Sequence, residues 1–301
     1  MRPAGRSWHG CRLYSTHYLP RHLDSLARRK YSRRAVSMRT APAPSHILSR
    51  GLAILGLGIS GPRHLTVEAV EYLRRAQKVL TLSAWSAELH QFNNHVTRLN
   101  DLYWSDDTDW NTYQRIARTV VRHARRGPGL IIFAVDGNPA VFDDIVWESY
   151  RLCRRAELPV TIVPGISSLD VLPIALRFDP GNVGLQIMEA NQLVVYDLVL
   201  NPHLATLVLQ VGWFGSSILR KRRHQTRRAL DPLVNHLLKF YPKNFPAFFV
   251  FDHRQGTQIL KTSVASIALH SSQIHPGMTL YLPRKEVKII DRRFYHALFR
   301  K

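Results

Sequence analysis

The sequence is poor in acidic residues. Its 301 residues include 42 Lys and Arg but only 21 Asp and Glu, and the formal net charge is +21. A surplus of this size attracts anions such as nucleic acid, acidic peptides or membrane surfaces, without choosing among them. The imbalance is greatest near the start of the chain, where residues 1–49 contain ten Lys and Arg and a single acid, Asp24.

Cysteines and long apolar runs are also scarce. The two cysteines, Cys11 and Cys153, cannot build a disulfide framework. With no secretory apolar segment either, they indicate a reducing compartment, and we expect a cytoplasmic protein. The run LIIFAV at 130–135 is far shorter than the ~18 residues of a membrane-spanning helix, so we expect no membrane partner. The histidines lack metal-ligand spacing and the cysteines are too few for a zinc cluster, so we expect no metal.

The termini differ from the rest of the chain. Residues 1–48 lack an apolar period and predict a basic, disordered leader. A mitochondrial-type transit peptide has a similar composition, and an over-long gene model starting upstream of Met38 is a third interpretation. We expect an N-terminal lobe at 49–164, a C-terminal lobe at 165–290 and a basic tail at 291–301.

Between the termini, strand and helix patterns alternate. Apolar runs predict strands at 52–58, 78–82, 129–135, 158–163, 205–215, 246–252 and 277–283. Amphipathic or capped stretches predict helices at 65–77, 111–127, 140–156, 164–176 and 230–242, and Ser167 and Asp170 have the spacing of a capping box. This alternation predicts an α/β fold with a largely parallel sheet in the N-terminal lobe.

The stretch GLGISG at 56–61 matches the dinucleotide pattern G-x-G-x-x-G. In a dinucleotide site the helix begins at the third glycine, and an acidic residue ends the second strand. Here Pro62 to His64 delay the helix, and the first acid after the second predicted strand is Glu88. An NAD(P)-binding oxidoreductase is therefore a weak alternative.

The same stretch, read as GLGISGPRHLT and followed by LRRAQKVL, resembles the opening of the tetrapyrrole (corrin/porphyrin) methylase superfamily, which uses S-adenosylmethionine (SAM). GNPAVF at 137–142 and PGISSLD at 164–170 match further turns of that family in the expected order. The resemblance spans about residues 51–283. It implies a two-lobed fold, with a mixed sheet in the C-terminal lobe, and a SAM-dependent methyltransferase activity.

A narrower resemblance is to the peptide-backbone N-methyltransferases of the borosin type and related free-standing bacterial enzymes. It rests on NTYQRIARTVV at 111–121, FDPGNVGLQIMEANQL at 178–193, LVLQVGWFG at 207–215 and GMTLYLP at 277–283. The resemblance implies N-methylation of a peptide or small molecule, and a homodimer. It also implies SAM contacts at Asn138, Val141, Phe142, Ser167, Ser168, Gln210, Met278 and Thr279, and a substrate cleft floored by Gly56 and Gly58.

In the peptide-methylating enzymes, tyrosines and an arginine before the N-T-Y helix activate the amide. Tyr103 and Tyr113 match tyrosine positions, but Asp109 occupies the arginine position. A carboxylate cannot stabilise an imidate anion, although it can accept a proton from an amine or bind a cationic substrate. We therefore take Tyr103, Tyr113 and Asp109 as candidate catalytic residues. The alternative is a solvated loop in which Asp109 or Asn111 caps the helix.

Two further functions keep the same fold. An RNA methyltransferase would use the basic charge, including six Lys and Arg in residues 220–228. A catalytically inactive SAM- or peptide-binding protein would follow from the loss of the arginine. RNA therefore remains a candidate partner beside a peptide or a small molecule.

Overall fold

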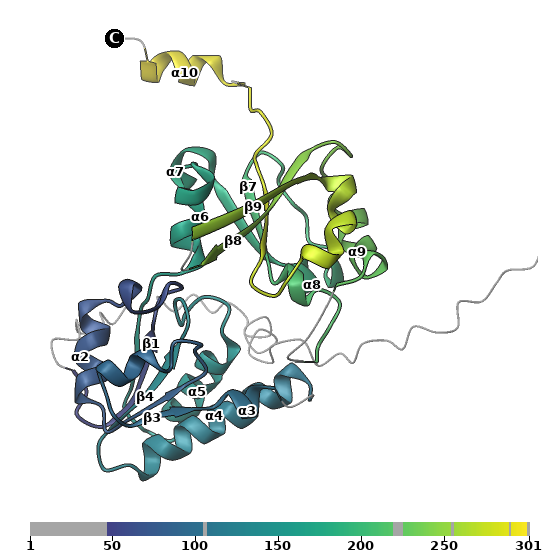
Figure 1. The fold of residues 1–301 in the computed structure, drawn as a ribbon. Coiled ribbons are helices and arrows are strands. Elements are labelled where there is room, and N and C mark those ends of the chain that lie inside the picture. Colours follow the sequence, from purple (N-terminus) through teal and green to yellow (C-terminus); the bar gives the residue numbers. More distant parts are fainter. Residues whose placement is uncertain (1–46, 105–106, 219–224, 254–255, 289, 300–301) are drawn as a thin grey trace, which may run out of the picture. The chain divides into compact units, whose positions relative to one another are not determined.

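The computed structural model describes residues 47–104, 107–218, 225–253, 256–288 and 290–299 (Figure 1). Almost all of the leader expected at 1–48 lies outside these residues, as does most of the basic segment at 220–228. The described chain contains two five-stranded sheets. The first is parallel throughout and the second is mixed, which confirms the predicted α/β class.

The first sheet has the order β3-β2-β4-β1-β5. Its strands are β1 (Gly51–Gly56), β2 (Lys78–Thr81), β3 (Val96–Arg98), β4 (Leu130–Val135) and β5 (Val160–Val163). Every residue of β1 and β4 is buried, because helices cover both faces of the sheet there. Burial on both faces explains why these two strands are uninterrupted apolar runs.

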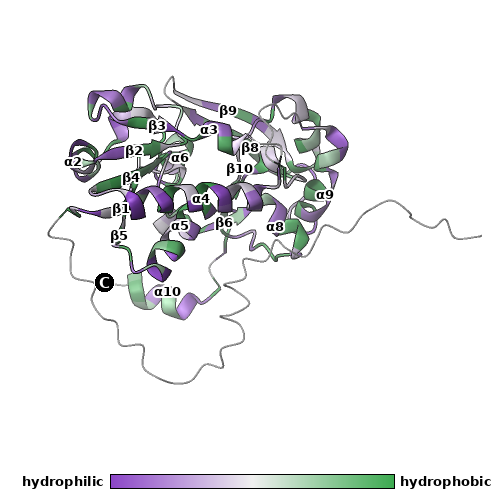
Figure 2. Cartoon of the chain, turned by 90° about the horizontal axis from the view of Figure 1, so that it is seen from below, coloured by the Kyte–Doolittle hydropathy of each residue, from purple (hydrophilic) through white to green (hydrophobic). Residues whose placement is uncertain are grey.

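Helices α2 (Val67–Arg75), α4 (Asp109–Arg126) and α5 (Asp144–Arg155) cover the first sheet (Figure 1). One core joins α4 and α5 to residues such as Ile54 and Phe133, and another joins α2 to residues such as Leu55 and Ile132. Alternate residues of a strand thus face opposite layers. Figure 2 shows the amphipathic character of α4, with hydrophobic and hydrophilic residues alternating along its length.

The second sheet has the order β6-β7-β10-β8-β9, and only the β6–β7 pair is parallel. Its strands are β6 (Leu185–Glu189), β7 (Ala205–Leu209), β8 (Pro246–His253), β9 (Gly256–Ser263) and β10 (Thr279–Leu282). The helices of this half are α6 (Ser168–Leu176), α7 (Pro180–Val183), α8 (Ala190–Val195) and α9 (Arg227–Leu237), with a long 3-10 helix η5 (Val264–Gln273).

Several elements differ from the sequence prediction. Strands β3, β6 and β9 were not predicted, and the strand expected at 205–215 ends at Leu209, where Gln210 adopts a left-handed conformation. Part of the basic tail forms helix α10 (Arg292–Phe299). Among the described residues, no helix is long and apolar enough to cross a membrane.

Candidate active site

Three glycine turns meet at the carboxyl ends of adjacent strands β4, β1 and β5. Gly58 and Gly137 form a two-way backbone bridge, with N···O distances of 3.2 and 2.9 Å. A Cβ on Gly165 would lie 2.4 Å from the Gly137 carbonyl oxygen and 2.8 Å from Cα of Gly56. Only glycine fits such a contact, so these turns, widely separated in sequence, are held together by backbone packing. Ligands of open α/β sheets bind at this edge.

The first glycine turn has the local structure expected from its sequence. Residues Gly61–His64 form a 3-10 turn (η2), and Thr66 caps α2, so the helix starts six residues after Gly61. The N–H groups of α2 are therefore not presented at the third glycine as a dinucleotide site requires. After β2, the Ser83 hydroxyl donates a hydrogen bond to Asp136 at the end of β4, and no acid ends β2 itself.

The GNPAVF turn exposes backbone and side-chain groups beside these glycines. The Asn138 carbonyl oxygen accepts a hydrogen bond from Val141 N at 2.9 Å, and its side-chain oxygen accepts one from Ala140 N at 3.0 Å. Phe142 has φ of 54° and the residue is 47% exposed. A left-handed, exposed phenylalanine is strained and unpacked, which is typical of a ligand-binding turn.

The serines of the PGISS turn differ in role. Ser167 is buried and caps α6, and Asp170 completes the predicted capping box. The Ser167 hydroxyl donates to the Asp170 carboxylate at 2.7 Å and accepts from Leu169 N at 3.1 Å. The Ser167 side chain is thus engaged in the cap, whereas Ser168, the first residue of α6, is half-buried.

The remaining predicted cofactor contacts lie in the second sheet. Gln210 follows β7 with φ of 59°, and Met278 and Thr279 lie at the start of β10. Strands β7 and β10 pair antiparallel, so these positions share one end of the strand pair. Met278 and Thr279 are almost fully buried, and Gln210 is half-buried.

The three predicted catalytic residues are close together around the start of α4. Tyr103 ends the short helix α3 (Asn100–Tyr103), and its ring centroid lies 6.3 Å from that of Tyr113, to which it is hydrogen-bonded. Burial raises the pKa of Tyr103 to about 12, although the hydrogen bond with Tyr113 offsets part of that rise. The charges of Asp143 and Asp109 add to it. Tyr103 therefore keeps its proton at neutral pH, and its hydroxyl is able to donate a hydrogen bond.

Asp109 is a buried carboxylate and does not cap the helix. Thr108 is the N-cap of α4, where its side chain accepts from Asn111 N at 3.3 Å, so the alternative in which Asp109 or Asn111 caps α4 is wrong. Asp109 is 6% exposed, and its carboxylate accepts from Trp110 N at 2.7 Å. Its neighbour Asp107 differs in being partly exposed and paired with Arg115 at 3.4 Å. The sequence places a third acid, Asp106, beside them, and it lies outside the described residues.

Two further carboxyls, near Tyr103 and Asp109 respectively, were not singled out from the sequence. Asp143 caps α5, accepting from Val146 N at 3.1 Å, and burial raises its pKa to about 6. Glu189 ends β6 and caps α8; burial raises its pKa, and the charge of Asp109 adds to the rise. Glu189 lies in the matched stretch FDPGNVGLQIMEANQL at 178–193, and Asp143 directly follows the GNPAVF turn. Neither side chain was assigned a role from the sequence.

Segment 211–218 completes the surroundings of Asp109. Asp109 N donates to the Ser217 carbonyl at 2.8 Å, and Thr108 forms a β-bridge with Ile218. The Trp213 ring stacks on that of Trp104, with centroids 6.3 Å apart. The start of α4 is therefore fixed by the loop that follows Gln210. Together these side chains form an aromatic and carboxylate cluster, which consists of Tyr103, Trp104, Tyr113, Trp213, Asp109, Asp143 and Glu189. The cluster combines an acid of raised pKa with hydrogen-bond donors, which is typical of proton-transfer sites.

Comparison with known families identifies the fold. Residues 51–264 match the model of the Tetrapyrrole (Corrin/Porphyrin) Methylases, which is more than half of the chain. The chain belongs to the tetrapyrrole methylase family. Solved structures agree at the level of the fold: uroporphyrin-III-C-methyltransferase from Thermus thermophilus superposes with a TM-score of 0.55 at 18% identity, covering 78% of this chain and 93% of that one.

Among curated proteins, this tetrapyrrole methylase is similar to fungal peptide precursors that contain a methyltransferase. It is 26% identical to the methyltransferase/ribosomally synthesized type I borosin cyclic peptide precursor of Coprinopsis marcescibilis, over 82% of this chain and 66% of the relative. A second such precursor, from Cerrena unicolor, is 25% identical over 82% of this chain and 62% of the relative. The match therefore spans less than two thirds of either relative.

Proposed function

We propose that this tetrapyrrole methylase is a SAM-dependent methyltransferase. The observation that carries the proposal is the convergence of three glycine turns at one edge of the parallel sheet, beside the aromatic and carboxylate cluster. The turns suit a nucleoside ligand, because Gly137 leaves its backbone approachable: a Cβ there would meet only Ile59, at 3.6 Å. A Thermus thermophilus structure of this fold is described as complexed with S-adenyl homocysteine, the demethylated product of SAM.

We assign SAM contact to three regions. The first is the 138–142 turn and the second is Ser168, with Ser167 supporting it through the α6 cap. The third is the end of the β7–β10 pair, through Gln210, Met278 and Thr279. Gly56 and Gly58 would floor the substrate side. These positions offer backbone groups and amide side chains, which can bind an adenosine and an amino-acid moiety.

We further propose that the transfer methylates nitrogen on a peptide or small molecule. The borosin precursors support a peptide substrate, and the local chemistry favours an amine as the nucleophile. A buried carboxylate at 109 destabilises an anionic imidate but attracts a cationic amine and can take its proton. Bound SAM supplies an electrophilic methyl group on a sulfonium.

The protein's own side chains then divide the remaining tasks. Asp109, or Asp143 with its pKa of about 6, accepts the proton that the amine loses as the N–C bond forms and the S–C bond breaks. Tyr103 and Tyr113 donate hydrogen bonds that orient the acceptor in line with the methyl group. Trp104 and Trp213 form an aromatic wall that excludes water.

One experiment tests this function. The full chain is titrated with SAM and with NAD by calorimetry, then incubated with SAM and a candidate peptide, and the products are examined by mass spectrometry. We expect SAM binding, S-adenosylhomocysteine release and the mass gain of one methyl group. SAM binding without S-adenosylhomocysteine would indicate a non-catalytic binding protein. Binding of NAD but not SAM would overturn the proposal, and methylation of RNA but not peptide would reassign the substrate.

A further inference from the structure

A cavity of about 570 Å³ lies at the amino ends of strands β2, β3 and β4, which is the opposite end of the first sheet from the candidate active site. Its walls come from the start of β2, the segment leading into β3, and the last turns of α4. The volume is in the range of small-molecule sites, roughly 300–1,000 Å³. Nothing in the proposed methyl transfer uses this cavity, because the three glycine turns occupy the carboxyl ends of the strands.

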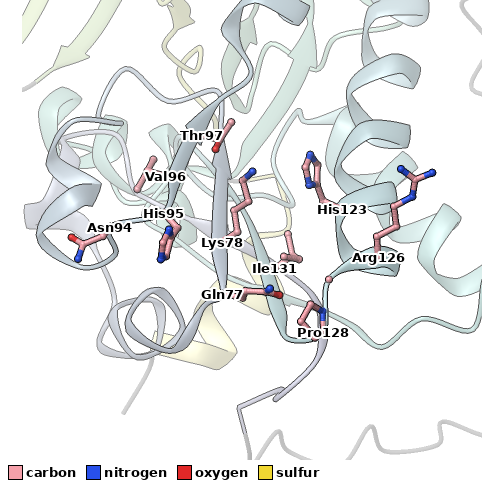
Figure 3. A pocket seen from close by; sticks show the side chains of 11 residues that line it. Gln77, Lys78, Asn94, His95, Val96, Thr97, His123, Arg126, Pro128 and Ile131 are labelled. Carbon is pink, nitrogen blue, oxygen red and sulfur yellow. The ribbon is translucent and has the colours of Figure 1, made fainter.

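The cavity exists because α4 covers only part of this sheet face. In β2, Leu80 packs into the core with α4, and Lys78, two residues earlier, is on the same face. Helix α4 packs against β4 and β1, so polar side chains lie beside the amino ends of β2 and β3. Figure 3 shows Lys78 and His123 projecting from β2 and α4 toward the same space.

The lining is basic and uncompensated. Lys78, His95, His123 and Arg126 line the cavity, and none of the described lining residues is acidic. Among described residues, no hydrogen bond or ion pair engages the side chains of Lys78, His123 or Arg126. Burial lowers the pKa of His123, and the charge of Lys78 lowers it further. The charges of Arg122 and Arg126 also lower the pKa of His123. The positive charges therefore lie near one another, and no acidic residue lines the cavity to balance them.

The end of α4 also contributes electrostatically. A helix C-terminus carries about half a negative charge, which by itself disfavours an anion. Lys78 and Arg126 bring two full positive charges, so the net field in the cavity stays positive. Gln77 adds a neutral donor: its side-chain oxygen accepts from Gly129 N at 3.0 Å, which turns its amide NH₂ away from that contact. The Thr97 hydroxyl lines the same space.

We propose that this cavity binds a phosphate monoester of nucleotide size. A phosphate monoester carries about −1.5 to −2 charges at neutral pH, which matches the two fixed cations and an imidazole able to gain a proton. Lys78 and Arg126 would hold the phosphate, and Gln77 and Thr97 would face the remainder of the ligand. Protonation of His123 adds a third positive charge, so the dianionic form of the phosphate binds more tightly when His123 is protonated.

The test is calorimetry on the full chain with uridine monophosphate, uridine and inorganic phosphate at fixed salt. We expect binding of the monophosphate, none of uridine, and weaker binding of inorganic phosphate. Uridine monophosphate lacks the adenine of SAM, so its binding reports on this cavity and not on the candidate SAM site. If the monophosphate does not bind, the methyltransferase proposal still stands. If SAM does not bind, the phosphate proposal still stands. Binding of uridine as tight as its monophosphate, or equal affinity for inorganic phosphate, would overturn the proposal. So would a short RNA that binds far more tightly than the nucleotide.

Variants localise the site. The double variant Lys78→Gln/Arg126→Gln should weaken binding of the monophosphate about tenfold or more, since charge-assisted hydrogen bonds are lost. Arg154→Gln/Arg155→Gln, in the last turn of α5, is the matched control with the same change in net charge, and it should change the affinity less than about twofold. Equal weakening by both pairs would mean non-specific attraction. NMR of the His123 ring should show a pKa that rises when the monophosphate binds, and an unchanged resonance would contradict the assignment.

Discussion

In the proposed methyl transfer, Asp109 is the residue whose chemistry most limits the reaction. It is buried at the start of α4, close enough to Glu189 and Tyr103 to affect the pKa of each. A neutral, isosteric replacement keeps the hydrogen bond from Trp110 N but removes the negative charge and the proton acceptor. The consequence should therefore appear in the rate of methyl transfer and not in the fold.

We expect Asp109→Asn to slow methyl transfer about 100-fold, because general-base catalysis contributes roughly 10²–10⁴. SAM affinity should change less than about threefold, since a proton acceptor is not needed for cofactor binding. S-adenosylhomocysteine release measures the rate, and calorimetry measures the affinity. Asp107→Asn, on a partly exposed carboxylate two residues away, is the control and should keep the wild-type rate. A fully active Asp109→Asn would show that this carboxylate takes no part in catalysis.

Asp143, in the same aromatic and carboxylate cluster, makes the stability of the protein depend on pH. Its pKa is raised from 3.8 to about 6, so its contribution to stability is fully present below pH 3.8 and is lost as the pH rises through 6. Asparagine also caps helices well and does not titrate. We expect Asp143→Asn to be more stable than the wild type at pH 8, by about 1–3 kcal/mol, from 1.36 kcal/mol per pKa unit.

Urea unfolding at pH 5 and pH 8 checks this expectation, and the gain should shrink at pH 5. Asp231→Asn, at an exposed carboxylate in α9, is a suitable control and should show no such pH dependence. A variant that is less stable than the wild type at pH 8 would mean that the ionised Asp143 carboxylate is stabilised by the fold.

At the scale of elements, the site depends on three turns that pack through glycines. A Cβ on Gly165 would meet backbone atoms of Gly56 and Gly137, and backbone cannot move aside as a flexible side chain can. By contrast, a Cβ on Gly215 would meet nothing within 4 Å, although its φ of 74° still favours glycine. The two positions separate the cost of a clash from the cost of a left-handed backbone.

We expect Gly165→Ala to lower the free energy of unfolding by about 2–3 kcal/mol or more through overpacking, and to weaken SAM binding. Gly215→Ala should cost about 1 kcal/mol, from its backbone conformation alone. Chemical unfolding and SAM calorimetry measure both. Similar costs at the two positions would indicate that the three turns can separate without strain.

The sequence predicted these elements unevenly, for physical reasons. Strands β1 and β4 are buried on both faces and read as continuous apolar runs, and the Ser167–Asp170 cap is local, so both were found. Strand β9 is mostly exposed, and β6 is only half-buried, so neither shows a clear apolar run. Asp143 was missed because its raised pKa comes from tertiary burial and not from a local pattern. The motif order predicted the family, but the proximity of Asp109 to Glu189 required the structure.

At the scale of the whole chain, two sheets of different type provide different parts of one proposed enzyme. The parallel sheet supplies the glycine turns and the candidate phosphate cavity at opposite ends, and the mixed sheet supplies Gln210, Met278 and Thr279. The net charge of +21 attracts anions to any part of the protein's surface, whether or not a specific site is present. Specific claims therefore need variants matched in net charge, as in the Lys78/Arg126 and Arg154/Arg155 pairs.

The most direct test of the central claim is a calorimetric titration of the full chain with SAM, with NAD titrated in parallel. We predict saturable, one-site binding of SAM, competition by S-adenosylhomocysteine, weakening by Gly165→Ala, and no NAD binding. Absence of SAM binding under conditions where the protein is folded, or binding unaffected by Gly165→Ala and displaced by NAD, would contradict the assignment of this edge of the sheet as a methyltransferase site.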